Sequence, residues 1–223
     1  MLRRIARGGE GQYPKNVIAL IDYGSGNLRS VHKALLQVGA EVRLARQPAD
    51  LKDADGVVLP GVGAFDDCIQ ALNQQGLLAA SRDYIQAGRP FLGICVGYQA
   101  LFEKSEEFNS CAAGLGVFRG KVVRFDAGNG LKIPQIGWNQ LEIARPECPL
   151  YRGIPDGSYV YFVHSFFPEP EDSSIVATRT DYGRRFASSV WRENVYATQF
   201  HPEKSQQIGL RLLANFVAET ERG

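Results

Sequence analysis

Short apolar runs alternate with amphipathic stretches through the first half of the chain. Mostly apolar runs bounded by glycine, proline or polar residues occupy positions 17–22, 42–45, 55–59 and 90–95. Stretches with the helical spacing of apolar side chains lie between them, at 27–38, 65–73 and 77–87. Such short runs are typical of strands that are buried on both faces of a parallel sheet. The alternation therefore predicts an α/β fold, in which a doubly wound and mostly parallel sheet is flanked by helices.

The pattern changes after Gly114, where short strands separated by turn residues replace the strand–helix alternation. We place these strands at 121–125, 159–163, 174–178, 186–191 and 195–200. They predict antiparallel hairpins added to the sheet in the C-terminal half. A final amphipathic helix is expected over 205–218, with apolar side chains on one face and Ser205 as its N-cap.

The length and the charge of the chain limit what it can be. Its 223 residues fit one domain with a sizeable core, which we place at 16–220. Residues 1–15 hold three arginines but no apolar core of a secretory signal, and we expect them to form a flexible leader. The formal net charge of +1 gives no support for a nucleic-acid partner. No apolar run approaches the roughly 20 residues that span a bilayer.

The four cysteines form neither the pattern of a disulfide framework nor that of a metal site. We interpret Cys68, Cys111 and Cys148 as structural thiols, because an unpaired cysteine usually packs as a small hydrophobic side chain. A reactive thiol at the remaining position would suit a reducing compartment. We therefore expect a cytoplasmic protein without a metal or a cofactor.

Cys95 is the strongest candidate for a nucleophile. It lies between Gly93 and Gly97 at the end of an apolar run, and a segment of helical character continues through Phe102. The Gly-x-Cys-x-Gly layout resembles a nucleophile elbow, where a strained strand-to-helix turn leaves no room for neighbouring Cβ atoms. The start of a helix also favours the thiolate. The alternative is a buried cysteine in an ordinary turn.

His201 and Glu203 are candidates for the base and for the acid that orients it. A cysteine nucleophile needs a base for its proton, and the base needs a third group that fixes its orientation. Residues i and i+2 of an extended segment point the same way, and Pro202 favours an extended backbone at His201. We therefore expect Glu203 beside the imidazole. A structural or surface histidine is the alternative, which the joint presence of nucleophile, base and acid disfavours.

The glycine-rich loop 60–63 follows a predicted strand, as a ligand-binding loop does in an open α/β sheet. Its glycines can expose backbone N–H groups, which stabilise the tetrahedral oxyanion of acyl transfer. We assign the oxyanion hole to the amides of Val62, Gly63 and Val96, of which the last is adjacent to Cys95. A plain glycine-rich turn is the alternative.

With these groups together, the sequence resembles the class I glutamine amidotransferases from about residue 17 to residue 217. Further segments narrow the resemblance, and they are DYGSGNLR at 22–29, LPGVGAF at 59–65, PQIGWN at 134–139 and YFVHS at 161–165. Together they resemble the glutaminase subunits of imidazole glycerol phosphate synthase, from histidine biosynthesis. The resemblance implies that a triad of Cys95, His201 and Glu203 hydrolyses glutamine to glutamate and ammonia.

The same resemblance implies a partner and further site residues. Ammonia would pass to a (β/α)8-barrel cyclase subunit in a 1:1 heterodimer, which makes imidazole glycerol phosphate and an aminoimidazole carboxamide ribotide. In this family the oxyanion loop can need a peptide flip, which keeps the glutaminase quiet until the partner and its ligand bind. The residues implied for glutamine binding are Gly63, Gln99, Glu107 and Ser165. Those implied near the partner are Asn27, Trp138, Tyr161 and Lys204.

Some alternatives stay open. Glu106 and Glu107 are not separated by the residues alone, and core packing competes with an interface role for the two aromatic residues. The chain could be another member of the family, such as the glutaminase of pyridoxal phosphate synthesis or a stand-alone γ-glutamyl hydrolase. It could also be a catalytically silent regulatory subunit. The intact candidate triad disfavours a silent subunit, and the further segments disfavour the other family members.

Overall fold

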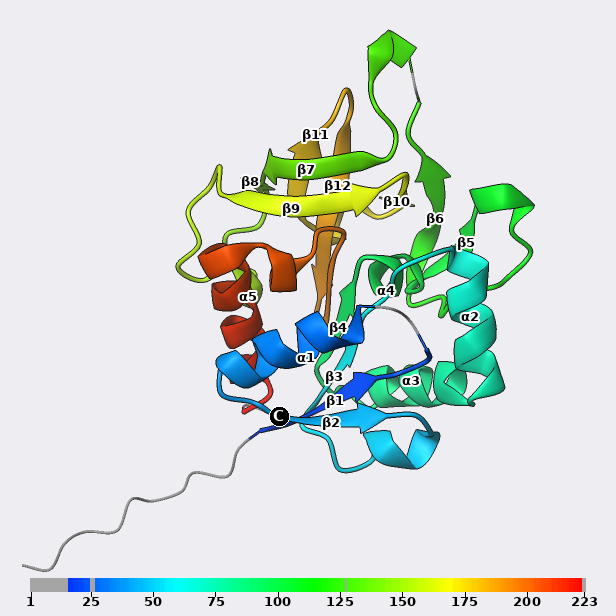
Figure 1. The fold of residues 1–223 in the computed structure, drawn as a ribbon, viewed down its shortest axis with the longest axis vertical. Helices are drawn as coiled ribbons and strands as arrows, with labels where there is room; N and C mark the ends of the chain where they lie inside the picture. The colour runs from blue at the N-terminus through cyan, green and yellow to red at the C-terminus, as the bar shows by residue number, and fades with distance from the viewer. Residues whose placement is uncertain (1–15, 25–26, 127, 222–223) are drawn as a thin grey trace, which may run out of the picture.

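The computed structural model describes residues 16–24, 27–126 and 128–221. Within them, the largest sheet has eight strands in the order β2-β1-β3-β4-β13-β12-β11-β8 (Figure 1). The leader that we expect at 1–15 lies outside the described residues. The assignment of 16–220 to a single domain stays a prediction.

One half of this sheet is parallel, and its strands come from both ends of the chain. They are β1 (Val17–Ile21), β2 (Glu41–Ala45), β3 (Gly56–Leu59), β4 (Phe91–Ile94) and β13 (Val195–Thr198). Every residue of β3, β4 and β13 is buried, which explains their mostly apolar sequences. The predicted doubly wound parallel sheet is thereby confirmed.

The other half of the large sheet and two smaller sheets carry the antiparallel additions. The large sheet continues through β12 (Arg185–Arg192), β11 (Val176–Asp181) and β8 (Glu142–Ile143). A second sheet has the order β10 (Phe166–Pro170), β6 (Phe118–Arg124) and β5 (Phe102–Ser105), and a third pairs β7 (Gln135–Gln140) with β9 (Tyr159–His164). The sequence did not predict β5, β7, β8 or β10. In β10 the reason is plain, since proline is tolerated in an edge strand but argues against a strand assignment.

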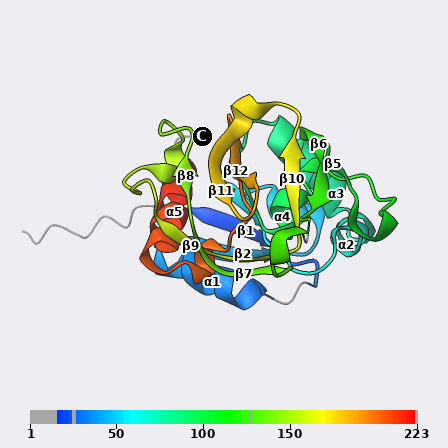
Figure 2. The ribbon, with the colours of Figure 1, turned by 90° about the horizontal axis from the view of Figure 1, so that it is seen from above.

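Two pairs of helices cover the sheet. They are α1 (Leu28–Gln37) with α5 (Gln206–Glu219), and α2 (Phe65–Gln74) with α3 (Leu77–Gln86). The two pairs lie on opposite sides of the parallel strands (Figure 2). This follows from the strand order, because β1 to β2 and β3 to β4 step in opposite directions while both crossovers are right-handed. The switch in direction leaves the carboxyl ends of the central strands open for a site.

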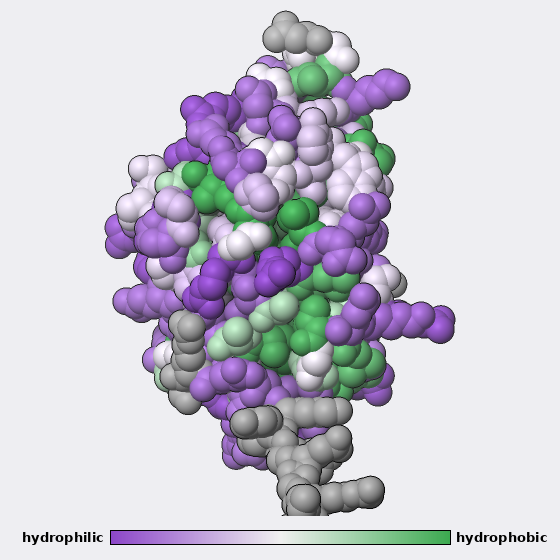
Figure 3. Space-filling view, turned by 90° about the vertical axis from the view of Figure 1, so that its left-hand side faces the viewer, coloured by the Kyte–Doolittle hydropathy of each residue, from purple (hydrophilic) through white to green (hydrophobic). Residues whose placement is uncertain are grey.

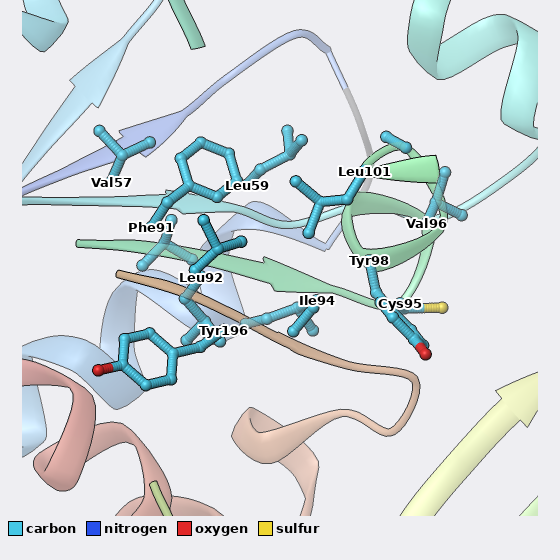
Figure 4. Close-up of a cluster of buried hydrophobic side chains, with 14 of the residues drawn as sticks. Val57, Leu59, Phe91, Leu92, Ile94, Cys95, Val96, Tyr98, Leu101 and Tyr196 are labelled. Carbon is cyan, nitrogen blue, oxygen red and sulfur yellow. The ribbon is translucent and has the colours of Figure 1, made fainter. Parts of the chain in front are cut away.

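The hydrophobic core runs up to the candidate nucleophile. Val57, Phe91 and Leu92 are fully buried between the helices, and Cys95 follows at the end of the same cluster (Figure 4). The sulfur of Cys95 projects away from the labelled apolar side chains in this view. The core therefore fixes the backbone of Cys95 and leaves its sulfur at the edge of the hydrophobic cluster.

The surface and the helices of the described residues bear on whether the chain could cross a membrane. On the face shown in Figure 3, hydrophobic side chains lie in patches among hydrophilic ones. Among the helices of the described residues, none combines the length and the apolar character that crossing a bilayer requires.

Candidate active site

Cys95 lies in a strained turn between β4 and α4 (Val96–Gln99). Its φ of 55° and ψ of −108° fall in a region that costs a residue with a side chain about 1–3 kcal/mol. Two glycines make the turn possible. A Cβ on Gly97 would lie 1.9 Å from the carbonyl oxygen of Leu59, and a Cβ on Gly93 would lie 2.6 Å from the carbonyl oxygen of Gly97. The structure therefore places Cys95 in the geometry of a nucleophile elbow.

The helix after Cys95 is shorter than the sequence suggests. It ends at Gln99, and the strand β5 begins at Phe102, so the prediction of helical character through Phe102 is wrong. The carbonyls of Ala100 and Leu101 accept hydrogen bonds from the backbone N–H groups of 115, 117 and 118 instead of continuing the helix. A long-range connection thus overrides the local helical pattern.

His201 and Glu203 lie side by side on the loop that follows β13. Nδ1 of His201 is 2.8 Å from Oε1 of Glu203, and both side chains are buried. The pairing arises differently from the expectation, because Glu203 belongs to a 3-10 turn over Pro202–Lys204 and not to an extended segment. His201 itself is extended, with φ of −99° and ψ of 98°.

The environment of His201 favours its protonated form. Burial of the ring opposes protonation, but the charges and contacts of Cys95 and Glu203 outweigh it and raise the pKa of His201 to about 10. Because Nδ1 is engaged by Glu203, the nitrogen available for the proton of Cys95 is Nε2. Nε2 makes no hydrogen bond within the described part of the chain. These groups can form a thiolate–imidazolium pair.

The loop of His201 is held from two sides. Ser205 was expected to cap α5, but its Oγ donates to the carbonyl oxygen of His201 at 2.7 Å and accepts from the N–H of Tyr161 at 3.0 Å. Ser205 does occupy the N-cap position of α5, as predicted, but its side chain makes no cap hydrogen bond there. Helix α5 approaches so closely that a Cβ on Gly209 would lie 1.8 Å from the carbonyl oxygen of Pro202. The loop thus has little freedom relative to β9 and α5.

A cavity of about 390 Å³ joins the candidate nucleophile and base, a size that suits a small ligand. Besides Cys95 and His201, its lining includes Val62, Gly63, Val96, Gln99, Glu107, Ser165 and Lys204. The structure thus brings the oxyanion and glutamine-binding candidates to one cavity. Glu203 lies behind His201 and does not line it. Gly63 has a φ of 100°, a conformation that favours glycine.

The structure separates the two glutamates that the sequence left undistinguished. Glu107 lines the cavity, and its Oε2 accepts the N–H of Phe65 at 2.8 Å, at the start of α2. Burial raises the pKa of Glu107, and the hydrogen bond from Phe65 opposes this shift. Glu106 instead pairs with Lys121 at 2.7 Å on the surface. Of the two, Glu107 is the one positioned to meet a ligand in the cavity.

Three of the four partner candidates form one group beside the loop of His201 and Glu203. Trp138 on β7 meets Tyr161 on β9 edge to face, with ring centroids 6.0 Å apart. Nζ of Lys204 lies 5.9 Å from the centroid of the Tyr161 ring. The fourth candidate, Asn27, contacts the candidate acid, because its Nδ2 lies 2.5 Å from Oε1 of Glu203.

His164 at the cavity and Gln199 beside Cys95 were not found by sequence reasoning. His164 lines the cavity, but burial lowers the pKa of His164 to about 3, and its Nδ1 is 2.9 Å from the carbonyl oxygen of Phe166, so the ring is neutral and structural. Gln199 is fully buried, and its Nε2 lies 3.7 Å from Sγ of Cys95. Its place two residues before His201 was the available signal, since alternate residues of an extended segment share a face.

Comparison with known proteins shows the family of the chain. The model of the family "Glutamine amidotransferase class-I" matches residues 19–220. The chain therefore belongs to the class I glutamine amidotransferase family. It is 52% identical, over 90% of its own length and 98% of the relative's, to the imidazole glycerol phosphate synthase subunit HisH of Syntrophotalea carbinolica. It is 50% identical to the HisH subunit of Thermosynechococcus vestitus, over 90% and 96% of the two chains.

Solved structures agree on the fold. A crystal structure described as a glutamine amidotransferase matches with a TM-score of 0.72 and 20% identity, over 92% of this chain and 98% of that one. PurLQS from Thermotoga maritima matches with a TM-score of 0.70 and 20% identity, over 92% and 97% of the two chains. At this identity the likeness concerns the architecture alone.

Proposed function

We propose that this glutamine amidotransferase is the glutaminase subunit of an imidazole glycerol phosphate synthase and that Cys95, His201 and Glu203 carry the reaction. The observation that supports the triad most directly is the buried hydrogen bond of 2.8 Å between Glu203 and His201, since His201 lines the same cavity as the strained Cys95. The HisH subunits, about half identical over nearly their full length, support the choice of enzyme.

The first half of the reaction forms a thioester. Nε2 of His201 takes the proton of Cys95, and the thiolate attacks the carboxamide carbon of glutamine. The tetrahedral oxyanion is stabilised by the amides of Val62, Gly63 and Val96. The carbon–nitrogen bond then breaks as His201 returns its proton to the nitrogen, which releases ammonia and leaves a γ-glutamyl thioester on Cys95.

The second half restores the enzyme. His201 removes a proton from water, which attacks the thioester carbon, and the carbon–sulfur bond breaks to give glutamate and the thiolate of Cys95. Glu203 keeps Nδ1 of His201 engaged throughout, so that Nε2 faces the reacting atoms. Glu107 offers a charge complementary to the α-ammonium group of glutamine, and Gln99, Gly63 and Ser165 supply further contacts from the cavity wall.

We further propose that the partner is a (β/α)8-barrel cyclase subunit in a 1:1 heterodimer. The relatives are named as subunits of a synthase, so a second subunit is expected. Trp138 is 46% exposed and Tyr159 is 54% exposed, and both lie on the β7–β9 pair that contacts the triad loop. A partner on this face would lie beside the site where ammonia is released. A thiol nucleophile also supports the cytoplasm as the compartment.

The decisive experiment measures glutamate release and product formation in the complex. We expect low glutaminase activity of the chain alone, and a strong rise with the cyclase loaded with its nucleotide substrate. Cys95→Ala should abolish glutamine-dependent synthesis but preserve synthesis from added ammonium salt, since the thiol serves ammonia production alone. Equal glutamate release with and without the loaded cyclase would favour a stand-alone γ-glutamyl hydrolase. Near-normal glutamine-driven turnover of Cys95→Ala would remove Cys95 from the mechanism.

A further inference from the structure

A buried pair of amide side chains leads from the wall of the cavity to the sulfur of Cys95. Nε2 of Gln99 lies 3.0 Å from the carbonyl oxygen of Phe166 and 3.3 Å from Oε1 of Gln199. Nε2 of Gln199 lies 3.7 Å from Sγ of Cys95. Gln99 and Gln199 are 100 residues apart in the sequence, and both are buried.

The chemistry of the groups fixes the direction of this chain of hydrogen bonds. A backbone carbonyl can only accept, so the group of Gln99 that faces Phe166 must be its NH₂. The same NH₂ group faces Gln199, which must therefore present its amide oxygen to Gln99. The NH₂ group of Gln199 is then left to face Cys95 and can only donate. The anchor at Phe166 thus determines that the sulfur is the acceptor.

The backbone holds Gln199 at this place. Its N–H donates to the carbonyl oxygen of Ser188 on β12 at 2.9 Å, and it directly follows the parallel strand β13. The next residue but one is His201, so one short segment delivers two groups to the same sulfur. His201 accepts the proton of Cys95. The side-chain amide of Gln199 does not ionise, so it can only donate a hydrogen bond to the charge that remains on the sulfur.

We propose that Gln199 is a further catalytic residue, which donates a hydrogen bond to the Cys95 thiolate and which Gln99 holds in the donating orientation. A sulfur that carries a negative charge accepts this bond more strongly than a thiol does, because hydrogen bonds to charged groups are the stronger ones. The bond therefore favours the thiolate and limits the directions in which the sulfur can point. Since Gln99 also lines the cavity, a ligand that contacts Gln99 acts on the nucleophile through Gln199. This inference rests on the proposed role of Cys95 as nucleophile.

The test follows the reactivity of Cys95 with iodoacetamide as a function of pH, in the full chain. Alkylation at Cys95 is separated from that at Cys68, Cys111 and Cys148 by peptide mass spectrometry, with Cys95→Ser as the blank. Gln199→Met removes the donor at similar volume, and Gln199→Glu replaces the donor by an acceptor that repels the thiolate. We expect the half-maximal rate to move to higher pH by about 1 unit in Gln199→Met and by more in Gln199→Glu.

Asn215→Leu is the matched control. Asn215 is a buried amide on α5 that donates to the carbonyl oxygens of Leu150 and Arg152, and it is not part of the cavity lining. Its loss should lower the melting temperature without moving the alkylation profile. A loss of packing alone would likewise leave the profile in place, so a shift in the Gln199 variants separates a catalytic role from a structural one.

The outcomes also separate this inference from the proposed function. Unmoved profiles in both Gln199 variants, with wild-type Cys95 reactive and glutaminase activity intact, would overturn the role of Gln199 and leave the triad standing. If Cys95→Ser retained glutamine-dependent turnover, the proposed function would fail whatever the Gln199 variants did. Should Gln199→Met not fold, Gln199→Glu, which keeps the contact with Gln99, carries the same test.

Discussion

Asn27 and Glu203 lie 176 residues apart in the sequence and are joined by a hydrogen bond of 2.5 Å. The oxygen of Glu203 that accepts from Asn27 is Oε1, which also faces Nδ1 of His201. The orientation of the Glu203 carboxylate is thus set by the start of α1 as well as by its own loop. Asn27 is predicted to lie near the partner, and the structure gives it a contact with Glu203.

We expect Asn27→Ala to lower kcat of the glutaminase by about two- to tenfold with little change in KM, which corresponds to the loss of one hydrogen bond. Asn27→Asp should cost more, because it places a second carboxylate beside Glu203. The measurement is steady-state glutamate release at saturating cyclase, so that a weaker complex does not mimic a slower enzyme. Asn16→Ala is the control. It removes a hydrogen bond from a side-chain amide to the carbonyl oxygen of Val217 at the other end of β1, and it should leave kcat unchanged.

Glu203→Gln should slow the glutaminase less than His201→Ala does. Removing a general base typically costs about 10²–10⁴-fold in rate, whereas a glutamine at 203 keeps a polar group beside Nδ1. Both variants are compared at the same concentration of complex, with ammonium-driven synthesis as the control for the partner. A milder effect of His201→Ala would show that the two roles are assigned the wrong way round.

The raised pKa of His201 makes part of the folding stability depend on pH. The pKa of His201 is about 10 in the folded chain, above the ordinary value of 6.5 that applies in the unfolded chain. The stabilisation is therefore complete below about pH 6.5 and is lost as the pH rises towards about 10. We expect the difference in free energy of unfolding between wild type and His201→Gln to shrink across this range. Chemical denaturation at several pH values measures it, and a difference that grows with pH would contradict the assignment.

Gly97→Ala should damage both the fold and the activity. The new Cβ would lie 1.9 Å from a backbone oxygen of Leu59, and overpacking of this kind costs about 1–3 kcal/mol or more because β3 cannot move away easily. Gly128→Ala is the control, since the nearest atom to its Cβ is a side-chain oxygen at 3.5 Å. Thermal melts and glutamate release are measured on both. A Gly97→Ala variant with wild-type melting temperature would mean that the elbow is less tightly packed than the structure shows.

The sequence was sufficient for features that depend on neighbouring residues. The elbow around Cys95 and the pair of His201 and Glu203 are local patterns, and the parallel half of the sheet follows from its apolar strands. The family resemblance supplied the glutamine-binding candidates Gly63, Gln99, Glu107 and Ser165, all of which line the cavity. The residues alone could not supply Glu107, because the physical pattern around it fits a solvated acid equally well.

Contacts between distant segments could not be predicted in this way. Asn27 reaches Glu203 across 176 residues, and no local spacing reveals this contact. Gln199 reaches Cys95 across 104 residues, and its spacing from His201 indicates a shared face but not the contact with the sulfur. The helix after Cys95 ended early for the same reason, because its carbonyls are taken by a later segment. The side chain of Ser205 makes hydrogen bonds to His201 and Tyr161 and none to the first turn of α5. A capping rule that considers neighbouring residues alone cannot predict this.

The close packing of Gly209 against Pro202 affects the order in which the site folds during synthesis on the ribosome. The chain is made from its N-terminus, so Cys95 and the parallel strands β1, β2, β3 and β4 emerge well before α5. Until α5 has formed and seated Gly209 on the loop, His201 lacks the support that holds it towards the sulfur. The nascent chain therefore contains Cys95 before the contacts that position His201 have formed.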